Sequence, residues 1–150
     1  MVVESRKHLD QKSPYDLIQE RYLDDPWRIM IVCIMLNLTR GRQVKDVINQ
    51  FFEKYPTPQK CAEAHTDDLT EIVRSLGMWQ KRTMTLIKFS QEWINGPWGD
   101  VSDLFGIGKY ARDAWAIFVE CRIPEPETIN DGKLKLYAEW ARNMVGVNNA

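Results

Sequence analysis

The stretch Val101-Ser102-Asp103-Leu104-Phe105-Gly106-Ile107-Gly108-Lys109-Tyr110-Ala111 decides the fold of this chain. Two glycines flank one apolar residue, Ile107, which can pack between a short helix before it and a longer helix, 109–120, after it. Glycine permits positive φ and leaves backbone N–H groups uncovered. Gly108 begins the second helix, where free N–H groups and the helix dipole favour an anion. The stretch therefore predicts either a main-chain phosphate clamp, which needs little net positive charge, or a plain turn between helices.

Outward from this stretch the pattern is helical almost throughout. Ser13-Pro14 and Asp25-Pro26 are helix starts, and Gly77 is a helix stop. Apolar periodicity predicts helices over 14–23, 27–36, 43–54, 58–64, 66–75, 80–93, 102–105, 109–120 and 131–143, with Met84, Ile87 and Trp93 facing the core. No run alternates as a strand does. We expect an all-α bundle of about eight to ten helices formed by residues 13–147, preceded by a charged tail, 1–12.

Composition limits the classes of function. The 150 residues carry a net charge of −1, which by itself argues against nucleic acid, because phosphate binding usually needs a basic surface. The arrangement of charge matters as well as its sum, and local runs such as Arg40-Gly41-Arg42 and 133–135 leave nucleic-acid binding open. No apolar run is long enough to span a membrane.

Cysteine and histidine provide no metal site by their spacing. Cys33, Cys61 and Cys121 are far apart, so we expect buried thiols with neither a disulfide framework nor a metal cluster. His8 and His65 fall in segments expected at the surface.

Asp131 lies 23 residues after Gly108, beyond a proline-containing loop and at the start of the last expected helix. An aspartate at that place caps the helix by accepting backbone N–H bonds, and capping alone is the ordinary interpretation. The alternative is a carboxylate that takes part in a reaction.

Taken together, the hairpin, the spacing and the capping Asp resemble the helix-hairpin-helix (HhH-GPD) DNA glycosylase superfamily, in which a catalytic Asp follows the hairpin at a similar distance. The similarity is greatest to the glycosylase domain of the methyl-CpG-binding-domain thymine DNA glycosylases. It extends in order over SPYDLIQE (13–20), DPW (25–27), LN (36–37), EKYP (53–56), LGMW (76–79), GIGKY (106–110) and DGKL (131–134).

This resemblance implies an enzyme that removes thymine or uracil opposite guanine by flipping the base out of duplex DNA, in the base excision repair of the nucleus. It implies an active site in a cleft between two helical halves, with Asp131 stabilising positive charge on the sugar and orienting water. The residues that it implies are catalytic Asp131, Tyr110 and Lys133; base-pocket Leu17, Ile18 and Gln19; and DNA-binding Gly106, Ile107, Gly108, Lys109, Leu38, Arg40, Gly41, Leu76 and Met78. Lys133 has a second interpretation as a solvated lysine.

Departures from the family refine the prediction. Tyr110 stands where bifunctional members carry a lysine nucleophile, and Lys109 is turned away by about 100° on the helix, so no strand cleavage is expected. The closely spaced cysteines of the iron–sulfur members are missing, so we expect no cluster, although a monovalent or divalent cation at the hairpin fits the family.

Met78 matches a leucine that fills the space of the flipped base, with a core position as the alternative. Leu38 replaces an arginine, for which Arg40 or Arg42 would have to compensate.

Two other functions stay open. A non-catalytic helical DNA-binding domain would keep the hairpin without the chemistry, and a helical protein-interaction module would use Asp131 as a cap and the hairpin as a turn. The first is favoured by the Leu38 departure, and the second leaves the similarity along the chain unexplained. The expected partner is duplex DNA with a G·T or G·U pair, bound by a monomer.

Overall fold

Helices make up nearly all the regular structure of residues 1–149, the part of the chain that this computed structural model describes. The α-helices are α1 (Pro26–Leu36), α2 (Gly41–Lys54), α3 (Pro58–Ala62), α4 (Thr66–Val73), α5 (Trp79–Asn95), α6 (Lys109–Phe118) and α7 (Gly132–Asn149). The 3-10 helices are η1 (Lys7–Asp10), η2 (Ile18–Arg21), η3 (Arg74–Leu76), η4 (Val101–Asp103) and η5 (Pro126–Thr128). The all-α class is confirmed, although the described residues form seven α-helices, and the expected helices 14–23 and 102–105 are replaced by the 3-10 helices η2 and η4.

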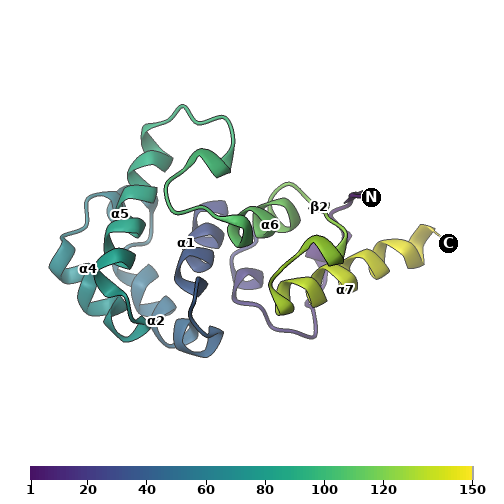
Figure 1. The fold of residues 1–150 in the computed structure, drawn as a ribbon, viewed down its shortest axis with the longest axis horizontal. Coiled ribbons are helices and arrows are strands. Elements are labelled where there is room, and N and C mark those ends of the chain that lie inside the picture. Colours follow the sequence, from purple (N-terminus) through teal and green to yellow (C-terminus); the bar gives the residue numbers. More distant parts are fainter. Residues whose placement is uncertain (150) are drawn as a thin grey trace. The chain divides into compact units, whose positions relative to one another are not determined.

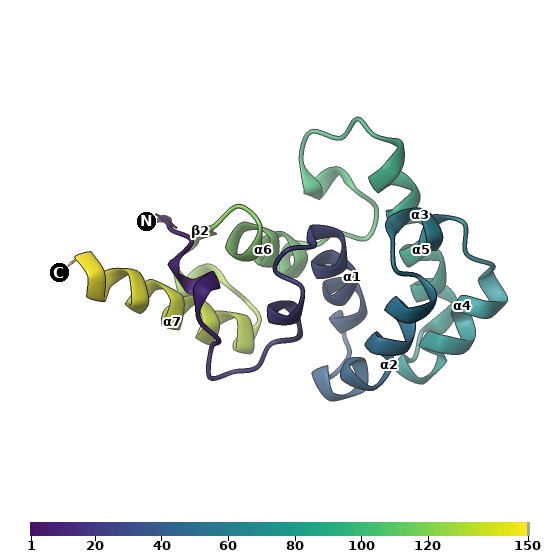
Figure 2. The same ribbon diagram turned by 180° about the vertical axis from the view of Figure 1, so that it is seen from behind.

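The chain divides into two compact units. The first unit contains Met1–Ile29 and the chain from Lys109 onward, and the second contains Met30–Gly108. In Figures 1 and 2 the first unit includes α6 and α7, and the second includes α2 to α5. The boundary follows the hairpin, whose glycines belong to the second unit and whose following helix belongs to the first.

In the second unit, α5 packs against α3 and α4 (Figure 2). Helix α2 buries the stripe that its periodicity predicts, and this stripe comprises Val44, Val47, Ile48, Phe51 and Phe52. The apolar helix α1 is buried from Ile29 to Met35, as expected for a helix that is hydrophobic on all sides. Burial of each such side chain stabilises the fold by about 1.5–3 kcal/mol.

In the first unit, α7 packs against η1, η5 and β2. The N-terminal residues belong to this packing, so the expected tail over 1–12 is wrong. Strand β1 (Val3–Glu4) pairs antiparallel with β2 (Arg122–Ile123), with Val3 opposite Ile123. His8, expected at the surface, is fully buried and donates from Nε2 to the carbonyl oxygen of Ile117 at 2.8 Å. The error arose because backbone pairing and a single buried imidazole leave no apolar periodicity.

Two helical expectations also need correction. Residues 14–17 are not helical, and only Ile18–Arg21 winds as η2. Met84, expected to face the core, is 55% exposed, and Arg82 occupies the buried face of α5 in its place. The three cysteines are buried as expected, and burial raises the pKa of the Cys61 thiol to about 11.

None of the helices over 1–149 has the length and apolar character needed to cross a bilayer.

Candidate active site

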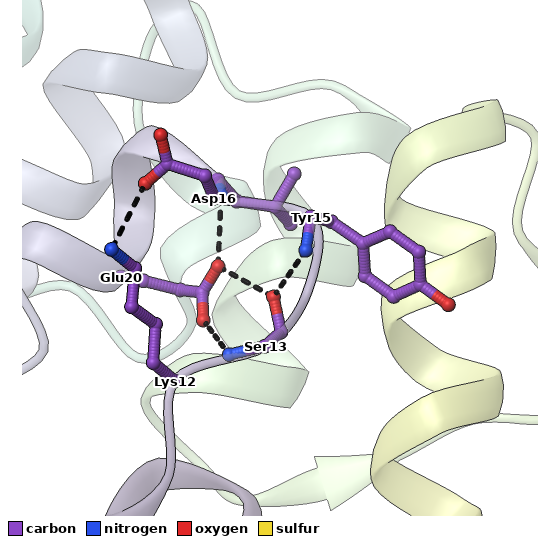
Figure 3. Close-up of polar contacts among 6 residues, drawn as sticks. Lys12, Ser13, Tyr15, Asp16 and Glu20 are labelled. Carbon is purple, nitrogen blue, oxygen red and sulfur yellow. Dashed lines mark hydrogen bonds and ion pairs between the residues drawn. The ribbon is translucent and has the colours of Figure 1, made fainter.

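The segment Ser13–Glu20 is folded around the carboxylate of Glu20 (Figure 3). Glu20 accepts three hydrogen bonds of 2.8 Å, from the backbone N–H of Ser13, the hydroxyl of Ser13 and the backbone N–H of Leu17. The Ser13 hydroxyl also accepts from the backbone N–H of Tyr15 at 3.2 Å. These bonds satisfy the donors locally, so the segment turns back on itself and the helix begins only at Ile18.

This turn places three expected base-pocket residues in the interior of the first unit. Leu17, Ile18 and Gln19 are 8%, 3% and 1% exposed. The Gln19 amide Nε2 donates to the hydroxyl of Tyr110, on α6, at 2.7 Å. A residue that the family resemblance assigned to the base pocket is therefore in direct contact with one that it assigned to catalysis, although 91 positions separate them.

Asp131 is the N-cap of α7. Its Oδ2 accepts from the backbone N–H of Leu134 at 2.9 Å, and its carbonyl oxygen accepts from the N–H of Lys135 at 2.9 Å, which confirms the predicted cap. Its side chain is exposed. The cap uses Oδ2, which leaves Oδ1 of this exposed carboxylate as a second acceptor. Lys133 is exposed on the first turn of the same helix.

Lys109, expected to contact DNA, is held by the protein itself. Its Nζ donates to the carboxylate of Asp113 at 2.7 Å and to the carbonyl oxygen of Thr128 at 2.6 Å. Both partners belong to the first unit. The ammonium group is therefore held along α6, next to the loop that leads to Asp131.

The two hairpin glycines differ in what surrounds them. Gly106 has φ +85°, and a Cβ there would lie 2.5 Å from the Thr85 methyl carbon, so only glycine fits. Gly108 has no atom within 4 Å of an added Cβ and no positive φ. Within the described chain neither glycine N–H donates to a protein acceptor. Ile107 between them is half-buried.

Two loops of the second unit carry exposed apolar side chains. Leu38 is 83% exposed with φ +58°, and Met78 is 49% exposed with φ +44°. The left-handed conformation costs a non-glycine residue about 1–2 kcal/mol. The exposure of Met78 overturns the alternative that it is a core residue. Leu76, expected to contact DNA, is 6% exposed, so its side chain belongs to the core.

The start of α2 follows the Leu38 loop directly. Arg40 is exposed, and its carbonyl oxygen accepts from the N–H of Gln43 at 3.0 Å. Gly41 is the first residue of the helix. Sequence reasoning placed both residues at the DNA surface, and the structure leaves the Arg40 side chain accessible for such a contact.

Arg82 is a site residue that sequence reasoning missed. It is 5% exposed, and burial lowers the pKa of its guanidinium. Its position on the same face of α5 as Leu86 and Phe89 was the available signal.

Over residues 1–149, no group of three or more His, Cys, Asp or Glu side chains is arranged to hold a metal ion.

Comparison with known proteins adds to this geometry. A family model described as "HhH-GPD superfamily base excision DNA repair protein" matches residues 31–147. The "Methyl-CpG-binding domain protein 4-like protein" of Arabidopsis thaliana is 34% identical over 131 residues, which are 87% of this chain and 29% of that protein. The "Thymine/uracil-DNA glycosylase" of Pyrobaculum aerophilum is 30% identical over 113 residues, which are 71% of this chain and 49% of that protein.

A solved structure shares the fold. The "structure of a thermostable thymine-DNA glycosylase" superposes with a TM-score of 0.61 at 22% identity, over 76% of this chain and 55% of that one. The chain thus spans about half or less of the length of the curated relatives named above.

Proposed function

Because this chain belongs to the HhH-GPD superfamily of base excision DNA repair proteins, we propose that it is a monofunctional DNA glycosylase that removes thymine or uracil opposite guanine. The observation that carries the proposal is Asp131, whose Oδ2 caps α7 while the side chain is exposed. The cap fixes the carboxylate in place, and its exposure leaves it accessible to a substrate.

The reaction requires the target nucleotide to leave the duplex, because its glycosidic bond is otherwise inaccessible. As the bond between C1′ and N1 breaks, its electron pair leaves with the pyrimidine and positive charge develops on the sugar. The fixed carboxylate of Asp131 stabilises this charge. A water molecule then bonds to C1′, and its proton passes to Asp131 and on to solvent. Thymine and uracil leave as stabilised anions, so no strong acid is needed.

Recognition of the pyrimidine is assigned to Gln19. Its amide carries both a donor and an acceptor, which match the carbonyl and N–H groups on a pyrimidine edge. The bond from its Nε2 to the Tyr110 hydroxyl sets the orientation of the amide. Tyr110 therefore acts on the base both directly, as a pocket wall, and through Gln19.

The absence of lyase activity is supported by Lys109. A lysine nucleophile must bring its amine to the sugar carbon. Nζ of Lys109 is instead bonded to the Asp113 carboxylate and to the carbonyl oxygen of Thr128, and Tyr110 offers no amine. We therefore propose base removal without strand cleavage, and we expect no iron–sulfur cluster within this sequence.

The DNA backbone is assigned to the hairpin. Gly106 is glycine because the fold needs it, whereas the surroundings of Gly108 would accept a side chain. A phosphate at the start of α6 explains a glycine there, since uncovered N–H groups at a helix N-terminus bind anions. This main-chain clamp reconciles DNA binding with the net charge of −1.

The substrate test uses duplexes with a central G·T, G·U or G·C pair, read with and without alkali and after borohydride reduction. We expect base loss from G·T and G·U, strand breaks only after alkali, and no trapped covalent complex. Breaks without alkali and a borohydride-trapped complex would show a bifunctional enzyme. Binding without base loss would leave the non-catalytic DNA-binding domain.

A further inference from the structure

Leu38 and Met78 combine two unfavourable features at the same positions. Each exposes a large apolar side chain to solvent, and each adopts positive φ without being glycine. Among the exposed large hydrophobic residues of the described chain, only these two have positive φ. Backbone strain of this kind persists where the surrounding structure enforces it, and it is concentrated at functional sites.

One buried guanidinium enforces the conformation of both loops. Arg82 Nε donates to the carbonyl oxygen of Gly77, the residue before Met78, at 2.9 Å. Its Nη2 donates to the carbonyl oxygen of Asn37, the residue before Leu38, at 2.8 Å, and to the Thr39 hydroxyl that follows Leu38. Its Nη1 donates to the carbonyl oxygen of Met35, near the end of α1, at 2.9 Å.

Basic residues outnumber acidic ones in the sequence on either side of each loop, although the chain as a whole is slightly acidic. Residues 26–45 contain no Asp or Glu, and neither do residues 72–91. The basic residues of the second unit are Arg40, Arg42 and Lys45 in the first stretch, and Arg74, Lys81, Arg82 and Lys88 in the second, where Arg74 is paired with Glu71. Apolar tips within cationic stretches match a polyanion that has stacked apolar bases within it.

We propose that Arg82 is a positioning residue that locks Leu38 and Met78 into one rigid two-point contact with the bases of duplex DNA. The inference rests on the proposed function, and it assigns Leu38 to the bases, where the related animal enzymes carry an arginine. The two tips enter the stack together and fill the space of the extruded nucleotide. The exposed arginines beside Leu38 neutralise the neighbouring phosphates.

The planar fork of arginine is essential to this role. Arginine offers five N–H donors in fixed directions, whereas lysine offers a compact ammonium that reaches fewer of the separated carbonyls. Arg82→Lys keeps the buried charge and removes the link between the loops. Thr39→Val removes the acceptor that follows Leu38 and the bond that the same hydroxyl donates to the Asn37 carbonyl oxygen, so it loosens one loop and leaves the Gly77 bond intact.

The first arm of the test reads the free protein by NMR of ¹³C-methyl-labelled leucine and methionine. We expect Arg82→Lys to shift the methyl resonances of both Leu38 and Met78, and Thr39→Val to shift those of Leu38 alone. Leu136 and Met84, exposed residues on regular helices, are the matched controls and should not move. A change at only one tip in Arg82→Lys, or at neither, would overturn the inference.

The second arm is a double-mutant cycle on single-turnover base release from a G·T duplex. Leu38→Ala with Met78→Ala should slow release at least about tenfold. Adding Arg82→Lys to that double variant should change the rate by less than about twofold, since its effect acts through the tips. Additive losses would show a merely structural arginine. If the wild type releases no base, the proposed function fails. The same double-mutant cycle is then measured by the fluorescence of 2-aminopurine placed beside the mismatch, and that measurement decides the inference about Arg82.

Discussion

Gly106 and Gly108 belong to one turn, but the structure requires them for different reasons. At Gly106 the backbone has positive φ and lies against Thr85, so the glycine is a condition of folding. At Gly108 neither conformation nor space demands a glycine. The sequence pattern G-I-G alone could not separate these roles, because both residues look the same until their surroundings are known.

We therefore expect opposite results from two alanine substitutions. Gly106→Ala should destabilise the protein by about 1–3 kcal/mol, since the new methyl meets Thr85 and the backbone is strained. Gly108→Ala should change stability by less than about 0.5 kcal/mol while weakening duplex binding, because its methyl covers the proposed phosphate site. Thermal unfolding and fluorescence anisotropy with labelled DNA measure the two effects. Unchanged binding by Gly108→Ala would contradict the clamp.

His8 gives the stability a pH dependence. Its Nε2–H is bonded to Ile117, Nδ1 is buried without a partner in the described chain, and burial lowers the pKa of His8. Arg6 opposes protonation and Asp10 favours it, while the Tyr137 ring packs against the imidazole at 6.1 Å. The unfolded chain then binds the proton more readily than the folded one.

The stabilisation from neutral His8 is therefore complete above its unfolded pKa of 6.5 and is lost as pH falls below that value. Urea unfolding at several pH values should show this loss, and His8→Gln should flatten the profile between pH 5 and 7. An equal slope in His8→Gln would assign the dependence to other groups.

For the helices, apolar periodicity correctly predicted the elements that are formed by apolar packing. It missed the segments whose conformation is set by polar contacts. The α2 stripe and the α7 cap agree with expectation because apolar spacing and a capping Asp are local signals. The segment 14–17 is not helical because the Glu20 carboxylate gathers donors from Ser13 and Leu17. On α5, helical spacing puts Arg82 on the same face as Leu86 and Phe89, but its carbonyl partners belong to other segments, and helical spacing does not identify them.

Glu20→Gln tests the turn that positions the base pocket. An amide has one acceptor oxygen in place of a carboxylate, so the three bonds from Ser13 and Leu17 cannot all persist. We expect a loss of about 1–3 kcal/mol in unfolding free energy. We also expect slower base release, since Gln19 adjoins the altered residue. Glu139→Gln, on the exposed face of α7, is the matched control and should change neither quantity.

At the scale of the whole molecule, residues distant in sequence are brought into one unit. Gln19, Tyr110 and Asp131 all belong to the first unit, whereas Leu38 and Met78 belong to the second. The family resemblance predicted this set of residues, but physical reasoning from sequence predicted only the cap and the hairpin. Pairings such as Gln19 with Tyr110 depend on chain topology, which local patterns do not encode.

The N-terminal residues are part of that topology. Deletion of residues 1–12 removes strand β1 and the buried His8, so we expect a clear fall in melting temperature. A shorter deletion of Met1 and Val2, both exposed, is the control. An unchanged melting temperature after the longer deletion would show that these residues are a dispensable tail.

The most direct test of the central claim compares the wild type with Asp131→Asn in the release of free thymine from a G·T duplex, measured by chromatography. Asparagine is also a good N-cap, so α7 and the melting temperature should be retained while the charge is lost. We expect release by the wild type and a loss of at least about a thousandfold in the folded variant. Equal release by the two proteins would contradict the assignment of the reaction to Asp131.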